Sequence, residues 1–287
     1  MRKRGLFLAC IVLAMPAGCR SPASLEDWMR EARSASYQPP DAAAQQALEQ
    51  AFASALAGAV DADAWQSFGY ELRLGRAGLA GGGAGRGVSE IAAREAAPVR
   101  RGWGAYVLRS GPARALLLQA PHAESDRGSG RIAYALYEQT QARGFARNTA
   151  HRRLPQADQA RAGASPFVLL TRAAVRFEPD LAVVQIHGFG SETAQRHGLA
   201  DDCVVASNGS HSPDPKLRAM AACLKASGFD VRLHPDEAAY PGGTLSPIGE
   251  ELRRLGSGRF VHLELGSALR EQLLMQPESM QSFAACL

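Results

Sequence analysis

Strands and helices alternate along the second half of the sequence, and this pattern limits the fold more than any other feature. Between residues 114 and 265, apolar segments of strand length are separated by segments with helical periodicity. The segments that we expect to be strands are ALLLQA, FARNTAH, LAVVQIH, CVVAS, FDVRL and RFVHLEL. Such alternation is typical of a parallel sheet covered by helices. The sequence therefore predicts an α/β fold, with a mainly parallel mixed sheet and helices on both faces.

The N-terminal part is predicted to lie outside this domain. Residues 1–19 start with basic residues, continue with an apolar stretch and end in small residues, which indicates a signal peptide. The closing PAGC resembles a bacterial lipobox, so we expect Cys19 to carry a lipid; cleavage elsewhere in the leader is the alternative. We therefore expect an exported, periplasmic lipoprotein that is anchored to the membrane.

Residues 20–95 are predicted to be a tether followed by a helical and loop extension, and residues 96–287 to be the α/β domain. The helical part covers residues 41–66, where large apolar residues recur every four positions, and the glycine-rich segment 79–87 is expected to be a loop. At the start of the domain, GWGAYVLRS and RALLLQAPH, joined by the turn GPA, indicate two antiparallel strands.

Charge and cysteine usage narrow the function classes. The 32 basic and 28 acidic residues are interspersed, so no nucleic-acid partner is expected. Cys203, Cys223 and Cys286 follow the leader, and two of them can pair in an oxidising compartment, although their spacing does not say which. None lies in a C-x-x-C or C-x-x-H pattern. A bound metal would therefore have nitrogen and oxygen ligands.

Three of the predicted strands end in a residue that can do chemistry. His122 follows ALLLQAP, His187 ends LAVVQIH, and Glu264 lies near the end of RFVHLEL. In open parallel sheets, ligands bind outside the carboxyl ends of the strands. We therefore expect His122, His187 and Glu264 to share one site.

Two histidines and a carboxylate form the usual donor set of a catalytic zinc ion, with one position left open for water. His122 and His187 supply the nitrogens. The carboxylate is either Glu124 or Asp126, which both lie in the loop after His122. We favour Asp126, because Gly128 and Ser129 after it allow a turn at the start of a helix, and we keep Glu124 as the reserve ligand.

Glu264 is predicted to be the general acid and base that takes a proton from a zinc-bound water and delivers it to the leaving amine. Arg270, in the predicted helix ALREQLL, is a candidate for binding a substrate carboxylate, with a solvated surface arginine as the alternative. His151 is a candidate for lining the same cleft, with an exposed histidine as the alternative. His262 is expected to be a hydrogen-bonded core histidine.

The segment HAESDRGSGRIAYAL resembles the zinc-site segment of the poly-γ-glutamate hydrolases, and QIHGF and HLELGSALREQL resemble that family's second zinc histidine and its closing glutamate strand. The N-formylglutamate amidohydrolases and zinc carboxypeptidases share the broader fold. The resemblance spans residues 102–274. It implies that His122, Asp126 and His187 are zinc ligands and that Glu264 is the general acid and base.

The leading hypothesis is an exported zinc-dependent hydrolase of an amide or peptide bond. Its substrate would carry a carboxylate, as in a γ-glutamyl or N-acyl amino acid or a small peptide. A cell-wall peptidoglycan amidase that uses the same site is one alternative. A non-enzymatic binding lipoprotein on the same fold is the other.

Overall fold

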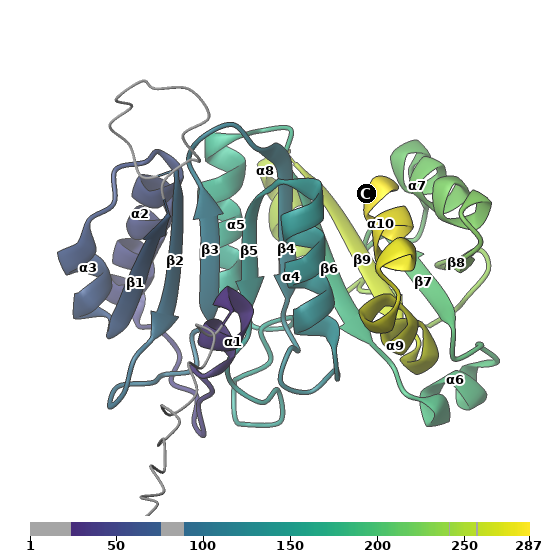
Figure 1. The fold of residues 1–287 in the computed structure, drawn as a ribbon, viewed down its shortest axis with the longest axis horizontal. Coiled ribbons are helices and arrows are strands. Elements are labelled where there is room, and N and C mark those ends of the chain that lie inside the picture. The colour runs from purple at the N-terminus through teal and green to yellow at the C-terminus, as the bar shows by residue number, and fades with distance from the viewer. Residues whose placement is uncertain (1–23, 76–88, 241, 257) are drawn as a thin grey trace, which may run out of the picture.

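The computed structural model describes residues 24–75, 89–240, 242–256 and 258–287. Its described strands form one nine-stranded sheet of order β1-β2-β3-β5-β4-β6-β9-β7-β8 (Figure 1). The strands are β1 (Tyr70–Gly75), β2 (Glu90–Glu95), β3 (Ala105–Arg109), β4 (Arg114–Ala120), β5 (Ala142–Arg147), β6 (Ala182–Gly188), β7 (Cys203–Ser207), β8 (Asp230–Leu233) and β9 (Arg259–Leu265).

The centre of the sheet is parallel and its two sides are not. β5, β4, β6 and β9 run parallel, whereas β1, β2 and β3 form an antiparallel side that joins β5, and β7 runs antiparallel to β9. The predicted α/β fold with a mixed sheet is confirmed. The four parallel strands direct their carboxyl ends to the same edge, which is where the predicted site residues lie.

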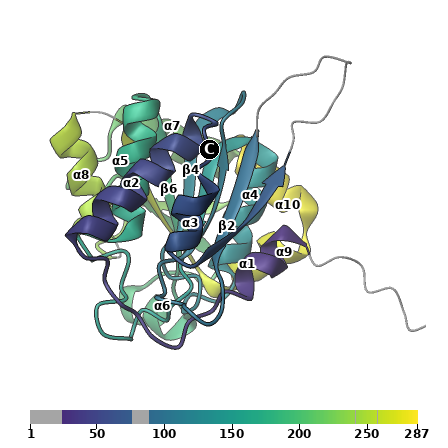
Figure 2. The same cartoon turned by 90° about the vertical axis from the view of Figure 1, so that its left-hand side faces the viewer.

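Helices cover both faces of the sheet, as the edge-on view shows (Figure 2). The helices are α1 (Leu25–Arg30), α2 (Ala42–Leu56), α3 (Ala62–Ser67), α4 (Ser129–Thr140), α5 (Pro166–Phe177), α6 (Ser191–His197), α7 (Pro215–Ala226), α8 (Pro247–Leu255), α9 (Ser267–Met275) and α10 (Pro277–Ala285). One buried cluster joins α1, α4, α7, α9 and α10 to the sheet, and a second joins α2, α3, α5 and α8 to the opposite face.

The two strands around the turn GPA were expected to be antiparallel, and β3 and β4 do run in opposite directions. They are not neighbours, however, because β5 lies between them and pairs with both. The chain leaves β4, crosses through α4 and returns as β5 parallel to β4. A short turn therefore joins two strands that do not pair with each other.

The predicted boundary after residue 95 does not coincide with an edge of the sheet. β1 and β2, from the segment 20–95, continue the sheet next to β3, and the predicted helix 41–66 becomes α2 and the start of α3. Trp28 of the expected tether is buried against the sheet. The leader 1–19 with Cys19 and the glycine-rich segment 79–87 lie outside the described residues.

The cysteine pairing that the sequence left open is a disulfide between Cys223 of α7 and Cys286, which follows α10, with Cα atoms 5.6 Å apart. Cys203 is a buried free thiol. Of the helices in the part of the chain described above, none is long and apolar enough to span a bilayer.

Candidate metal centre and active site

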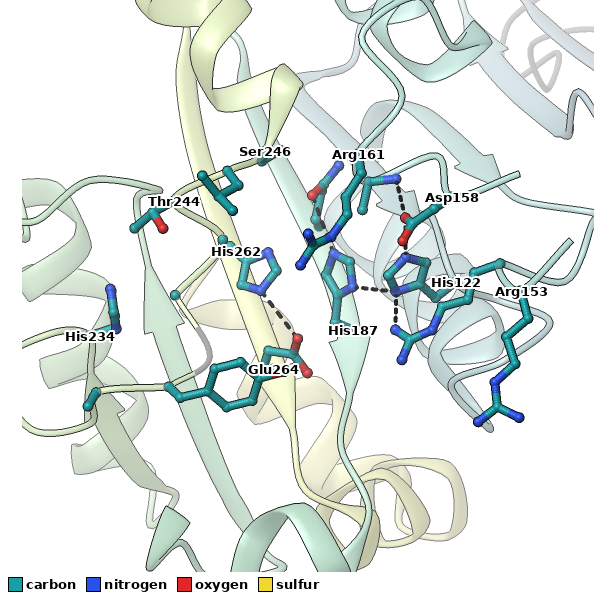
Figure 3. Close-up of a pocket in the computed structure, with 18 residues that line it drawn as sticks. His122, Arg153, Asp158, Arg161, His187, His234, Thr244, Ser246, His262 and Glu264 are labelled. Carbon is teal, nitrogen blue, oxygen red and sulfur yellow. Dashed lines mark hydrogen bonds and ion pairs between the residues drawn. The ribbon is translucent and has the colours of Figure 1, made fainter. Parts of the chain in front are cut away.

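The strand register brings two of the predicted site residues side by side. His187 near the end of β6 is directly opposite Glu264 near the end of β9, and His122 follows β4, which flanks β6 on its other side. All three line one cavity of about 610 Å³ at the carboxyl edge of the sheet (Figure 3). The expectation that these strand ends share a site therefore agrees with the structure.

Asp126 reaches the same place through one turn of helix. Its backbone N–H donates to the carbonyl oxygen of His122 over 2.7 Å, a bond between residues four apart that closes a helical turn directly after β4. Gly128 follows with a φ of 88°, in the left-handed region, and α4 begins at the next residue. The side chains of His122 and Asp126 thus lie on the same side of this turn.

The ligand atoms of three residues converge. Nδ1 of His122 lies 3.1 Å from Nδ1 of His187 and 3.4 Å from Oδ2 of Asp126, and the third separation, His187 Nδ1 to Asp126 Oδ2, is 3.8 Å. Ligands that are 2.0–2.1 Å from a tetrahedral zinc ion lie about 3.3 Å apart. The spacing within the group His122, Asp126 and His187 is therefore close to that of the ligands of a tetrahedral zinc ion.

Glu124, the reserve ligand, points elsewhere. Its carboxylate accepts a hydrogen bond from the Arg147 guanidinium over 2.8 Å and pairs with Arg33 over 2.6 Å. Arg147 in turn donates to Glu26 of α1. Both oxygens of Glu124 are thus bound to arginines, and Asp126 is the carboxylate that lies beside the two histidines.

Each of the two histidines has a side-chain oxygen near its second ring nitrogen, Nε2. Nε2 of His122 lies 2.8 Å from Oδ1 of Asp158, and Nε2 of His187 lies 3.3 Å from Oε1 of Gln185. An acceptor on Nε2 favours a proton there, so that the Nδ1 lone pair is free for a metal. Sequence reasoning missed Asp158, which is 36 residues from His122 and has no local signal.

The two histidines of the centre have opposite pKa shifts. Burial alone would lower the pKa of His122, but hydrogen bonds with Asp126 and Asp158 raise it above its ordinary value. Burial and the neighbouring His262 and His122 rings hold the pKa of His187 well below its ordinary value. The guanidinium of the partly exposed Arg152 lies 3.0 Å from His122 Nδ1 and 3.8 Å from Asp126, so this side chain would have to move away when a metal ion binds these ligand atoms.

Glu264 is joined by a histidine that we expected in the core. Nε2 of His262 lies 3.4 Å from Oε1 of Glu264, and the His262 ring packs against the His187 ring with centroids 4.3 Å apart. His262 is buried and lines the cavity, but neither of its ring nitrogens has a hydrogen bond among the described residues. The sequence did contain a signal for this placement, because His262 and Glu264 are two residues apart and such residues share a face of a strand.

Arginines line another side of the cavity. Arg152, Arg153 and Arg161 lie on the segment that follows β5, and in the part of the chain that the structure describes neither Arg153 nor Arg161 forms an ion pair. His151, the predicted lining residue, is exposed and does not line the cavity; its Nδ1 accepts from the backbone N–H of Arg153. The place of this segment after a parallel strand indicated that it would border the site. Its arginines line the cavity, however, and its histidine does not.

Arg270, the predicted carboxylate-binding residue, does not line the cavity that holds His122, His187 and Glu264. Its side chain is buried and donates to the carbonyl oxygens of Arg127 and Phe189, over 2.8 and 2.9 Å, and to that of Leu265. These three carbonyls belong to the segments that carry Asp126, His187 and Glu264. Arg270 therefore connects the three segments of the site through hydrogen bonds to their backbone carbonyls.

Comparisons with known proteins return structures only. No protein-family model matches the sequence, and no curated protein matches it. The chain is similar to a solved N-formylglutamate amidohydrolase from Ralstonia eutropha, with 12% identity, a TM-score of 0.41, and coverage of 62% of this chain and 95% of that one. It is also similar to a bacteriophage poly-γ-glutamate hydrolase, with 14% identity, a TM-score of 0.40, and coverage of 62% and 83%.

A gene product of Agrobacterium tumefaciens matches with 15% identity, a TM-score of 0.39, and coverage of 59% of this chain and 85% of that one. The solved structures to which this chain is similar thus include an N-formylglutamate amidohydrolase and a poly-γ-glutamate hydrolase.

Proposed function

We propose that the protein is a zinc-dependent hydrolase of an amide or peptide bond in a substrate that carries a carboxylate. The observation that carries this proposal is the convergence of His122 Nδ1, His187 Nδ1 and Asp126 Oδ2 beside Glu264, at the wall of a cavity large enough for a small peptide. Two nitrogens and one carboxylate oxygen leave a tetrahedral ion one open position.

A zinc ion held by these residues would supply Lewis acidity toward water and toward the substrate carbonyl. Glu264 is the general acid and base of the proposal, because its carboxylate lines the cavity next to His187 and can take a proton from water and return it to the leaving amine. His262 Nε2 lies 3.4 Å from this carboxylate and limits where it can point.

The substrate carboxylate is assigned to the arginines of the cavity and no longer to Arg270. Arg153 and Arg161 line the cavity, and neither has an ion-pair partner among the described residues. A guanidinium group binds a carboxylate through two parallel hydrogen bonds. The class of substrate that the sequence suggested is retained, while the residues that recognise it change.

The test is the zinc content of the purified protein and of two variants in the same loop. We expect one zinc per chain in the wild type and a loss of zinc affinity of more than about 100-fold in Asp126→Asn, because a ligand is lost. Glu124→Gln is the matched control: it weakens the pairs with Arg147 and Arg33 but leaves the donor set complete. A wild-type protein that binds no zinc, or an Asp126→Asn protein that binds it normally, refutes the proposal.

We also propose that the protein is exported and anchored through Cys19. The leader 1–19 and the Cys223–Cys286 disulfide support this, since disulfides persist mainly in oxidising compartments. Mass spectrometry of the mature N-terminus from a membrane fraction tests it: a lipid-modified Cys19 is expected, and an intact leader in the cytoplasmic fraction would refute it.

A further inference from the structure

A polar row crosses the centre of the sheet directly behind the proposed metal. Gln119 of β4 is in register with Gln185 of β6, and Gln185 is in register with His262 of β9. All three are buried. One step earlier on the same face, the corresponding in-register side chains are apolar, namely Leu117, Val183 and Phe260. The face therefore changes from apolar to polar one row before it reaches His187 and Glu264.

Hydrogen bonds connect two residues of this row to a metal ligand and to a helix. Oε1 of Gln185 lies 3.3 Å from Nε2 of His187, and the amide nitrogen of Gln185 donates to Oε1 of Gln119 over 3.0 Å. The amide nitrogen of Gln119 donates to Oγ1 of Thr171 in α5 over 3.0 Å. The Thr171 hydroxyl donates to the carbonyl oxygen of Phe167 over 2.8 Å.

The donor and acceptor roles in this series of hydrogen bonds follow from its first member, Thr171. The Thr171 hydroxyl donates its proton to the carbonyl oxygen of Phe167, and its oxygen accepts from the amide nitrogen of Gln119. Gln119 consequently turns its own oxygen toward Gln185, which must donate to it and turn its oxygen toward His187. The Nε2 atom of His187 must then carry a proton, and Nδ1 must be the bare nitrogen.

We propose that Thr171, Gln119 and Gln185 are positioning residues that hold His187 in the tautomer and orientation required of a metal ligand. This inference rests on the proposed zinc centre for its purpose, but the tautomer itself is a property of the protein alone. The alternative is that the two amides only satisfy each other in the core.

The cost of the row supports a positioning role. Burying two amides and a hydroxyl gives little net stability even when every hydrogen bond is made, and apolar side chains of similar volume would continue the pattern of Leu117 and Val183. Thr171 and Gln119 do not line the cavity, and Gln185 and His187, which do, expose almost none of their surface. A partner on the second nitrogen of a metal-binding histidine sets its tautomer and raises its basicity.

The experiment measures the tautomer of His187 and the affinity for zinc in Gln185→Leu and in Thr171→Val. Long-range ¹H–¹⁵N NMR of the metal-free protein, with the His187 signal assigned by its loss in His187→Ala, should show the Nε2-protonated form in the wild type. In Gln185→Leu we expect a mixture of tautomers and a zinc affinity about 10- to 100-fold weaker by chelator competition. Thr171→Val keeps the volume, lies outside the cavity and should shift both readouts in the same direction by less.

Val183→Ala is the matched control, because Val183 lies two residues before Gln185 on the same strand and face. It should lower the free energy of unfolding but leave the tautomer and the zinc affinity unchanged. Wild-type tautomer and affinity in both Gln185→Leu and Thr171→Val would overturn the inference, as would an equal loss of affinity in Val183→Ala. A wild-type protein with the Nε2-protonated His187 but no zinc affinity would instead refute the proposed function and leave the positioning chain standing.

Discussion

Asp126 and Glu124 differ in role because the loop after β4 is a helical turn. Residues two apart share a side in an extended chain, whereas on a helix they point about 200° apart and residues four apart about 40° apart. The turn closed by the bond between Asp126 N–H and the His122 carbonyl therefore puts Asp126 beside His122. Glu124 is turned the other way, toward Arg147 and Arg33.

Replacement of Glu264 by glutamine separates proton transfer from metal binding. We expect Glu264→Gln to keep full zinc content and to lose about 10²- to 10⁴-fold in kcat, the usual worth of a general acid or base. Zinc analysis and initial rates on N-acyl and γ-glutamyl amino acids measure the two quantities. Undiminished turnover would remove Glu264 from the mechanism.

The arginines at the cavity wall are expected to act in substrate binding. Arg153→Gln together with Arg161→Gln should raise KM for a carboxylate-bearing substrate about 10-fold and leave kcat almost unchanged, because they bind a group that does not react. Arg196→Gln, in an exposed pair with Glu192 on α6, is the control. A KM that is the same in the double variant and the control would contradict this assignment.

At the scale of elements, α5 was not predicted although its start carries clear signals. Ser165 caps the helix by accepting from the Val168 N–H, and Pro166 occupies the first turn. The apolar run after Pro166 does not by itself distinguish a buried helix from a strand. The helix matters for the site, because it carries Thr171 on the side that faces the sheet and Arg172 on the side that faces α8.

The contact between α5 and α8 predicts an acid-dependent loss of stability. Hydrogen bonds from Arg254 and Arg172 outweigh the effect of burial and lower the pKa of Glu251 to about 2. Between this value and the ordinary value of 4.5, the unfolded chain binds more protons than the folded protein, so stability falls as the pH drops from about 5 to 2.

Because the arginines are partly exposed, we expect wild type to lose only about 1 kcal/mol more than Glu251→Gln between pH 6 and pH 3. Denaturant unfolding at pH 6 and pH 3 measures the difference. If the two proteins lose the same unfolding free energy, the Glu251 pair does not contribute as described.

At the scale of the whole molecule, the first described helix and the C-terminal helix are both tied to the rest of the fold. Trp28 packs into the cluster formed by α4, α9 and α10, with the Arg73 and Arg94 guanidinium groups each 4.5 Å from its ring centroid. At the other end, the Cys223–Cys286 disulfide closes a loop of 63 residues that includes α8 and β9. Neither cysteine lines the cavity.

Removal of this disulfide should affect stability and not catalysis. We expect Cys223→Ala together with Cys286→Ala to lower the free energy of unfolding by about 2–4 kcal/mol, since the crosslink restricts the unfolded chain. Zinc content and turnover of the folded variant should match the wild type. Denaturant unfolding in parallel with rate measurements checks both, and an unfolding curve equal to that of the wild type would contradict the prediction.

The local sequence pattern was sufficient to predict the parallel strands at the centre of the sheet and the polar residues near their ends. Each of the segments around His187 and Glu264 contains an apolar run, which predicts a buried strand, and a polar residue near its end, which predicts a site residue. His122 was predicted from the same kind of local pattern, and so was the turn that Gly128 allows after Asp126. The insertion of β5 between β3 and β4 was not predictable in this way, since pairing depends on partners distant in sequence.

Only the tertiary structure decided which polar groups face the cavity and which support it. Arg270 and Arg153 are both arginines near a strand end, yet one is buried against three carbonyl groups and the other lines the cavity. His262, Asp158 and the chain from Thr171 to His187 likewise gain their partners from other strands and loops. The sequence by itself determined the types of the ligands and their places at strand ends, because these are local. Orientation depends on contacts between segments that meet only in the folded chain.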